Sequence, residues 1–183
     1  MPLNDRFKNN MSKKASTMTF RLDDDVLAEL RKESQHKEIS LNTLANQILR
    51  QHVRWDLYLS KVGMIPIAKP VVSAIFAKMT ESDINDLASN VGKDAVRDIV
   101  LFMEGSVTID SYLSWFELRM KNSFIEVNHV ENGTTHTFVV KHDLGYNWSL
   151  YHKKLLDITF YELFKTPMKI TITNSTLSFD IEE

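Results

Sequence analysis

A short alternating segment near the amino end constrains this chain more than any other feature. Residues 17–22 read Thr-Met-Thr-Phe-Arg-Leu, so polar and apolar side chains alternate with the period of a half-exposed strand. Met18, Phe20 and Leu22 share one face of that strand. A single strand leaves its backbone donors and acceptors without partners. The segment therefore needs a second strand beside it.

Two short amphipathic helices are predicted directly after this segment. Aspartates at residues 23–25 stop the strand and place acidic groups at the start of a helix over about residues 24–35. Ser40 is a good cap for a second helix, which continues to about Trp55. A strand and two helices of roughly 40 residues are too small to bury their apolar face as a monomer. Two chains that pair their strands antiparallel and interlock their helices remove both problems.

The segment STMTFRLDDDVLAELRKESQHKEISLNTLANQILRQHV resembles the ribbon-helix-helix DNA-binding family of the Arc and MetJ type, over residues 15–54. The resemblance implies a homodimer whose paired strands enter the major groove of double-stranded DNA. It also implies a prokaryotic transcription regulator, such as a repressor. The family often has glycine in the turn between the helices, where this chain has Lys37 or Glu38.

The polar face of the strand has the chemistry to read base edges. Alternate strand residues lie about 6.6 Å apart, which is close to two base-pair steps of about 3.4 Å. An arginine can bind guanine O6 and N7 together, and the start of the second helix offers backbone N–H groups to a phosphate. The alternative is that these are ordinary strand residues and a surface charge. The residues predicted to bind DNA are Thr17, Thr19, Arg21, Ser40, Leu41, Asn42, Lys13 and Lys14.

Charge is divided unevenly along the chain, whose net charge is −2. Residues 1–54 carry ten Lys and Arg against seven Asp and Glu, and residues 55–183 carry twelve against seventeen. Residues 1–14 are predicted to be a flexible basic arm that neutralises phosphates, although a solvated tail without a partner is the alternative.

Beyond a predicted linker over residues 57–70, which contains Gly63, Pro66 and Pro70, the sequence predicts a separate domain over residues 71–183. The domain before the linker covers residues 15–56. The helices predicted after the linker cover about 71–79, 80–91, 93–104 and 108–120, with Gly92 and Gly105 as terminators. Residues 80–83 are expected to cap the second of them, and Thr108 or Asp110 is expected to open the fourth.

Two hairpins are expected after these helices, at Asn132-Gly133 and at Asn174-Ser175. A helix over about residues 148–164, capped by Asn147, lies between them. The predicted fold class is α+β: a ribbon-helix-helix unit (β-α-α, an intertwined dimer), then a helical section and a ββαββ domain with one sheet face covered by helix.

The first hairpin places two histidines together. If Asn132-Gly133 form the turn, His129 faces His136 directly, with Cβ atoms about 5 Å apart. Such a pair could hold a divalent metal with Glu131 nearby. The alternative is a pair of rim histidines at a hairpin tip that bind nothing.

A second candidate site in the C-terminal domain is a small-molecule pocket lined by His142, Trp148 and Tyr151. The alternative is that these aromatic side chains are core. The segment KHDLGYNWSLYHKKLLDITFYELF resembles uncharacterised prokaryotic regulator-like proteins. That resemblance implies no particular chemistry.

The composition excludes several classes of function. The absence of cysteine rules out disulfides and thiolate sites, and no nucleotide-binding loop or catalytic motif is present, so we expect neither an enzyme nor a cofactor. Without a signal peptide or an apolar stretch of about 20 residues, a cytoplasmic protein with no membrane partner is expected.

The expected function is a DNA-binding regulator that acts as a homodimer, with the C-terminal domain sensing a small-molecule or metal effector or strengthening assembly. The alternative is an antitoxin-type protein that binds a partner protein through its C-terminal half. A third class is an enzyme joined to a DNA-binding unit.

Overall fold

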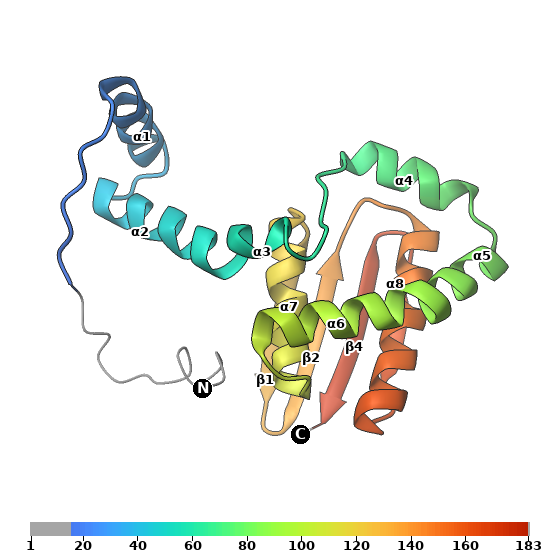
Figure 1. Ribbon diagram of the computed structural model, residues 1–183. Coiled ribbons are helices and arrows are strands. Elements are labelled where there is room, and N and C mark those ends of the chain that lie inside the picture. The colour runs from blue at the N-terminus through green and yellow to red at the C-terminus, as the bar shows by residue number, and fades with distance from the viewer. Residues whose placement is uncertain (1–15, 183) are drawn as a thin grey trace. The chain divides into compact units, whose positions relative to one another are not determined.

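The computed structural model describes residues 16–182 and shows a mixed α+β protein (Figure 1). The chain forms two units that divide between Ile65 and Pro66. The predicted basic arm, with Lys13 and Lys14, lies outside the described residues. Within residues 16–182, none of the helices combines the length and the apolar character needed to cross a bilayer.

The N-terminal unit contains the two predicted helices. Ser40 caps the second helix as predicted, because its Oγ accepts the N–H of Thr43 at 3.0 Å. Asp23 stands at the N-cap position of the first helix, but its side chain makes no cap hydrogen bond. The second helix continues through a π-helical turn and a last short helix. The elements are α1 (Asp24–His36), α2 (Leu41–Gln51), η2 (His52–Asp56) and α3 (Leu57–Leu59).

The strand predicted over residues 17–22 is not formed in the single chain. Residues 16–23 have no regular secondary structure and run as an extended trace before α1 (Figure 1). The physical reason is that a strand requires a ladder of backbone hydrogen bonds, and no other described segment pairs with these residues. A ribbon-helix-helix unit therefore stays a prediction, because its ribbon needs a second copy of the chain.

The turn after α1 holds Glu38 in the left-handed region, with φ 53°. The N–H of Glu38 donates to the carbonyl of Gln35 at 3.1 Å, and the N–H of Ile39 donates to the carbonyl of Ser34 at 3.0 Å. This pair of hydrogen bonds is the Schellman cap, which prefers glycine at the position that Glu38 occupies. Glu38 therefore stands where a glycine was expected in this turn, and it adopts the left-handed conformation that glycine favours.

We expect Glu38→Gly to raise the free energy of unfolding by up to about 1 kcal/mol. Glycine removes the Cβ clash at positive φ, although its greater freedom in the unfolded chain offsets part of the gain. Lys32→Gly, in the interior of α1, should instead lower the free energy of unfolding by about 1 kcal/mol. Denaturant titration of the two variants beside the wild type measures both effects. A Glu38→Gly protein less stable than the wild type would contradict the strained turn.

The C-terminal unit begins with helices, two of which are capped as the sequence predicts. Thr80 and Thr108 both form capping boxes, and Gly105 ends a helix at φ 77°. The elements are α4 (Lys69–Lys78), α5 (Glu81–Asp86), η3 (Leu87–Gly92), α6 (Lys93–Glu104) and α7 (Ile109–Asn122).

The prediction that Gly92 ends a helix was wrong. Gly92 has φ −62°, and α5, the π-helical segment η3 and α6 follow one another without a break. Packing favours glycine here instead, since a Cβ at this position would lie 2.7 Å from Oη of Tyr151 and 3.2 Å from Cδ1 of Leu155. A larger residue would force the end of the Tyr151 side chain to move.

A four-stranded antiparallel sheet follows, in the order β1-β2-β4-β3, and the predicted ββαββ succession is confirmed. Helix α7 packs against β1, and α8 packs against β3 and β4. The largest buried side chains of the core are Trp115, Tyr112, Phe116, Phe138, Phe160 and Phe179. The elements are β1 (Glu126–Asn132), β2 (Thr135–Lys141), α8 (Tyr146–Thr159), η4 (Phe160–Phe164), β3 (Lys169–Ile172) and β4 (Thr176–Glu182).

Asn147 does not cap α8, contrary to the prediction. Gly145 occupies the N-cap position, and Nδ2 of Asn147 instead donates to the carbonyls of Phe76 and Met79, each at 2.9 Å. These carbonyls lie at the end of α4, and the carbonyl of Phe76 also accepts the N–H of Met79 at 3.1 Å. Asn147 therefore joins the end of α4 to the start of α8.

The turn of the first hairpin also differs from the prediction. Asn132 pairs with Thr135, so Gly133 and Thr134 form the turn. Gly133 has φ 66° at the first central position, where a type II′ turn requires glycine. His129 therefore pairs with Phe138, and His136 pairs with Glu131. The predicted direct pairing of His129 with His136 was wrong.

Candidate functional site

The residues predicted to contact DNA lie on the surface of the N-terminal unit. Thr17, Thr19 and Arg21 are exposed along the extended segment. At the start of α2, Ser40 and Asn42 are exposed and Leu41 is half-buried. The N–H groups of Leu41 and Asn42 belong to the first helical turn, which has no preceding helical carbonyls to accept them.

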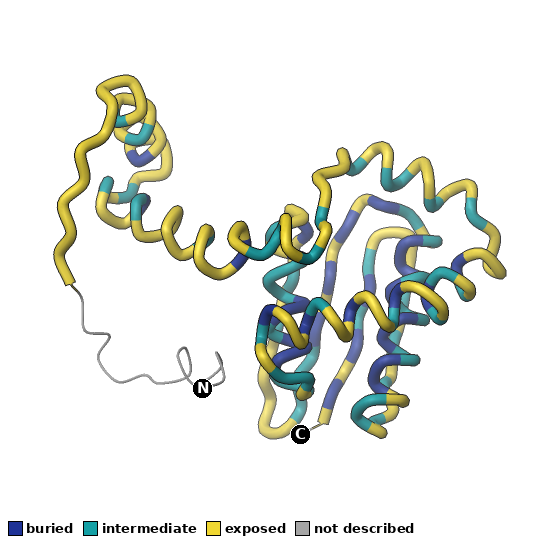
Figure 2. Tube along the Cα trace, viewed as in Figure 1, coloured by how far each residue is buried: buried dark blue, intermediate teal, exposed yellow. Residues whose placement is uncertain are grey.

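The apolar side chains of the same unit are also exposed, as the colours of the N-terminal unit in Figure 2 show. Met18 is 74% exposed and Phe20 is 56% exposed in the extended segment, where they belong to the apolar face of the predicted strand. Among residues 16–65 only Ser34, Leu44 and Trp55 are buried. The other large exposed apolar side chains of α1, α2, η2 and the extended segment are Leu22, Val26, Ile48, Leu49 and Val53. An exposed apolar surface of this kind marks an interaction site.

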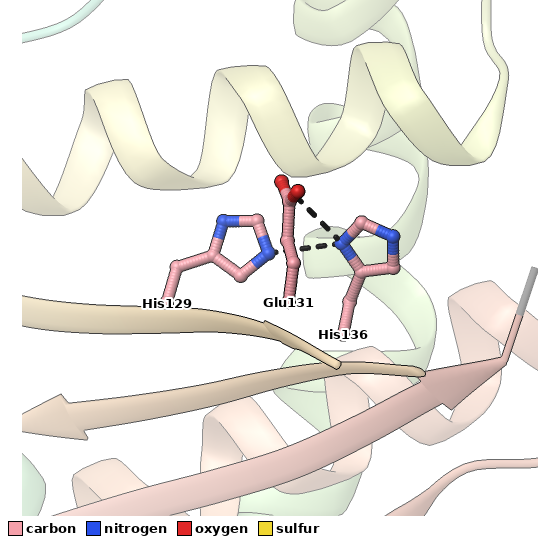
Figure 3. Close-up of side chains that lie close together, drawn as sticks. All are labelled: His129, Glu131 and His136. Atoms are coloured by element: carbon pink, nitrogen blue, oxygen red, sulfur yellow. Dashed lines mark hydrogen bonds and ion pairs between the residues drawn. The ribbon is translucent and has the colours of Figure 1, made fainter. Parts of the chain in front are cut away.

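A cluster of two histidines and a glutamate lies at the first hairpin (Figure 3). Nε2 of His129 and Nδ1 of His136 are 3.0 Å apart, and Nδ1 of His136 lies 4.0 Å from Oε1 of Glu131. One ligand atom from each residue lies within 4.8 Å of the others. The structure thus brings together the two histidines and the glutamate that the sequence predicted, by a diagonal contact across the strands.

Glu117 is a member of this cluster that the sequence did not predict. It lies on α7, and its Oε1 is 2.9 Å from Nδ1 of His129. This contact makes Nδ1 the protonated nitrogen of His129, so Nε2 carries the lone pair that faces His136. Nothing in the local sequence pairs residue 117 with residue 129. Only the packing of α7 over β1 does so.

The residues of the predicted small-molecule pocket lie in or against the core of the C-terminal unit. His142 and Trp148 are buried, with ring centroids 4.4 Å apart, and Tyr151 contacts the ring of Phe76 at 5.6 Å. Two shallow hollows of the surface are lined by Asp157, Ile158, Tyr161, Glu162, Pro167 and Met168, and by Lys69, Pro70, Ser73, Ala74, Ala77 and Asp143. Neither includes the three predicted residues, so a ligand site at them stays a prediction.

Both ring nitrogens of His142 have a polar partner. The N–H of Leu144 donates to its Nδ1 at 3.2 Å, so Nε2 carries the proton and donates to Oγ of Ser149 at 2.7 Å. Oγ of Ser149 then donates to the carbonyl of Thr173 at 2.8 Å. This chain of hydrogen bonds ties the end of β2 through α8 to the second hairpin.

His152 is a second buried neutral histidine. Its Nδ1 donates to the carbonyl of Trp148 at 3.0 Å, whereas its Nε2 has no hydrogen-bond partner among the described residues. Burial lowers the pKa of His152 well below its ordinary value, and burial likewise lowers the pKa of His142. Over a range of pH below the ordinary histidine pKa, both rings are therefore uncharged in the folded chain, whereas the same rings are charged in the unfolded chain.

We expect acid to destabilise the C-terminal unit through these two rings. Their folded pKa values lie below the unfolded value of about 6.5, so the unfolded state binds more protons as the pH falls below about 6.5. At about pH 5.5, His152 lowers the free energy of unfolding by up to about 1.4 kcal/mol, and His142 acts in the same direction. Denaturant titration of the wild type and His152→Leu at about pH 7.5 and about pH 5.5 measures the loss, which the variant should reduce. His36→Gln, at an exposed position, should leave it unchanged. An equal loss in His152→Leu and the wild type would contradict the assignment.

Comparison of the chain with protein-family models finds no match, and comparison with the curated proteins finds none either.

Proposed function

We propose that this chain is a sequence-specific DNA-binding regulator that acts as a homodimer through a ribbon-helix-helix unit over residues 16–56. The observation that carries the proposal is the exposed apolar face of the extended segment, where Met18 and Phe20 are more than half exposed. An alternating segment with an exposed apolar face and unpaired backbone groups is incomplete as a single chain.

A second copy of the chain is the partner that completes this segment. Two identical segments that pair antiparallel about a two-fold axis form the backbone ladder that each lacks alone. The same arrangement brings the apolar faces of both copies together with the exposed side chains of α2, among them Ile48 and Leu49. Burial of each large apolar side chain contributes about 1.5–3 kcal/mol, so several in each copy support a stable dimer.

The other face of the paired segments then points outward. It carries Thr17, Thr19 and Arg21, which are all exposed. A two-stranded ribbon fits the major groove, where threonine and arginine side chains can bind base edges. The division of charge supports this orientation, because residues 1–54 carry an excess of basic side chains and residues 55–183 an excess of acidic ones. The acidic half is repelled by phosphates and leaves the N-terminal unit to approach the duplex.

The alternative of an antitoxin-type protein has less support. Antitoxin tails of the kind that bind a toxin tend to be short and disordered, whereas residues 66–182 form a sheet and helices around a core of large aromatic side chains. We therefore assign the C-terminal unit to ligand sensing or to assembly of the regulator. Nothing in the described residues favours an enzymatic role for it.

Selection of bound sites from random DNA duplexes at a fixed salt concentration tests the proposal. We expect the full-length protein to enrich one short sequence present twice, because the two strands of one symmetric ribbon offer equivalent side chains to the groove. The same selection at higher salt should return the same sequence with fewer bound molecules, since phosphate contacts weaken while base contacts keep their preference. Recovery of unrelated sequences at both salt concentrations would reject sequence-specific binding.

A further inference from the structure

We propose that His129, His136 and Glu131 bind a divalent transition metal of the zinc class, and that Glu117 orients His129 for this role. The site lies wholly in the C-terminal unit and does not depend on the proposed DNA binding. The first support is the spacing of the two nitrogens. Two nitrogens on a tetrahedral metal, each about 2.05 Å from it, lie about 3.3 Å apart. Nε2 of His129 and Nδ1 of His136 are 3.0 Å apart, so a small opening of the pair admits the ion.

The second support is the protonation of His129. Histidines that bind metals commonly donate their other ring nitrogen to a carboxylate, which fixes the tautomer and the ring orientation. Oε1 of Glu117 lies 2.9 Å from Nδ1 of His129 and supplies this carboxylate from α7. Nε2 of His129 therefore carries the lone pair, and the proton between the two rings belongs to Nδ1 of His136. A metal ion takes the place of that proton, which must leave Nδ1 when the ion binds.

The third support is the rigidity of the cluster. The ring of His129 stacks on Phe138 with centroids 4.1 Å apart and an angle of 15° between the planes, and Phe138 is fully buried. Both histidines lie on paired strands, which hold side chains more firmly than a loop does. The side chains of His129 and His136 are 25% and 15% exposed, so an ion can reach them from solvent.

The donor set defines the class of metal. Two imidazole nitrogens and one carboxylate favour zinc, nickel or cobalt over magnesium and calcium, which prefer oxygen ligands. The chain contains no cysteine, so a thiolate ligand is excluded. Glu131 is 69% exposed at the hairpin tip and can swing toward the ion. Three protein ligands leave the fourth position of a tetrahedral site to water or to another ligand.

Equilibrium dialysis of the full-length protein against zinc tests the proposal. We expect one zinc ion per chain, with His136→Ala and His129→Ala each weakening binding at least tenfold. Glu117→Gln, which keeps its shape but loses its charge, should weaken binding about tenfold to hundredfold because it acts through His129. His52→Ala is the matched control and should bind as the wild type does. His52 also lies near a carboxylate, Asp56 at 3.8 Å, but it belongs to no metal-binding cluster within residues 16–182.

Circular dichroism and the denaturation midpoint of each variant without metal show whether the hairpin still folds. His136→Gln serves as a second variant if His136→Ala does not fold. Cobalt titration gives an independent readout, because cobalt(II) in a four-coordinate site absorbs visible light far more strongly than hydrated cobalt(II). The histidine variants should lose this absorption band. Less than one zinc ion per chain in the wild type would overturn the proposal. Equal binding by the wild type and His129→Ala would overturn it as well.

Discussion

Replacement of Arg21 with alanine is expected to reduce discrimination between the selected site and random duplex by about tenfold to hundredfold for each half-site. Arg21 is exposed and belongs to the polar face of the extended segment. A guanidinium that binds guanine O6 and N7 contributes about 1–3 kcal/mol of preference for guanine over the other bases. Binding to random duplex should weaken only as far as the loss of one positive charge from each chain requires. Titration of both duplexes with the variant at one salt concentration measures the ratio.

Arg31→Ala is the matched control for this prediction. Arg31 lies on α1, is exposed, and carries the same charge in the same unit. Its removal should lower affinity for the selected and random duplexes alike, with a salt dependence smaller by at most about two ions per dimer, one for each copy. If Arg21→Ala keeps the wild-type ratio, or if Arg31→Ala loses it equally, Arg21 does not read bases.

Phe20→Asp is expected to weaken the dimer at least a hundredfold and to abolish specific DNA binding with it. The side chain of Phe20 is 56% exposed in the single chain, and the proposed partner covers it. The dimer contains the substitution twice, so loss of about half of the 1.5–3 kcal/mol for full burial in each copy gives about 1.5–3 kcal/mol. A carboxylate in an apolar interface adds a further desolvation cost. Sedimentation equilibrium over a wide concentration range measures the dissociation constant.

Leu101→Asp is the control for this substitution. Leu101 lies on α6 in the C-terminal unit and is 50% exposed, so the change in polarity and exposure is closely matched. The control should dimerise and bind DNA as the wild type does. Both variants should keep the wild-type helix content of α1 and α2. A Phe20→Asp protein with an unchanged dissociation constant would remove the extended segment from the interface.

Local sequence signals predicted the helix boundaries well where a cap or a period was strong. Ser40, Thr80 and Thr108 each cap a helix as expected, because short polar side chains bind the first N–H groups wherever such a helix begins. Gly105 ends a helix because glycine readily adopts the left-handed conformation, which is also a local signal. Gly92 shows the limit of this reasoning. Its role depends on Tyr151, which lies far away in the sequence.

The sequence placed His129 and His136 on the same face of the hairpin correctly, but it predicted the wrong cross-strand partner for each of them. The turn moved from Asn132-Gly133 to Gly133-Thr134, which shifted the partner of His129 from His136 to Phe138. A shift of two residues keeps every side chain on its original face, because side chains alternate with a period of two. His129 and His136 therefore stayed neighbours, by a diagonal contact. Alternation determined the face of each side chain, whereas the turn type determined the register.

Other contacts had no local signal at all. Glu117 reaches His129 only because α7 packs over β1, and Asn147 binds the end of α4 only because α8 begins beside it. Their residue types are ordinary for exposed helix positions, so composition and periodicity gave no reason to choose them. The strand over residues 17–22 was the converse case. Its pattern was clear, but its partner was not within the described chain.

Disulfide formation between two copies of the extended segment tests the central claim most directly. The chain has no cysteine, so a single cysteine placed in turn at each of positions 17–21 reports only on contact between copies. Opposite residues in an antiparallel pair have Cα atoms about 4.5–5.5 Å apart, which suits a disulfide. We predict rapid formation of the covalent dimer at one position near the two-fold axis and a decrease on either side of it. The claim is contradicted if no position forms the dimer faster than a cysteine replacing the exposed Asn46 on α2.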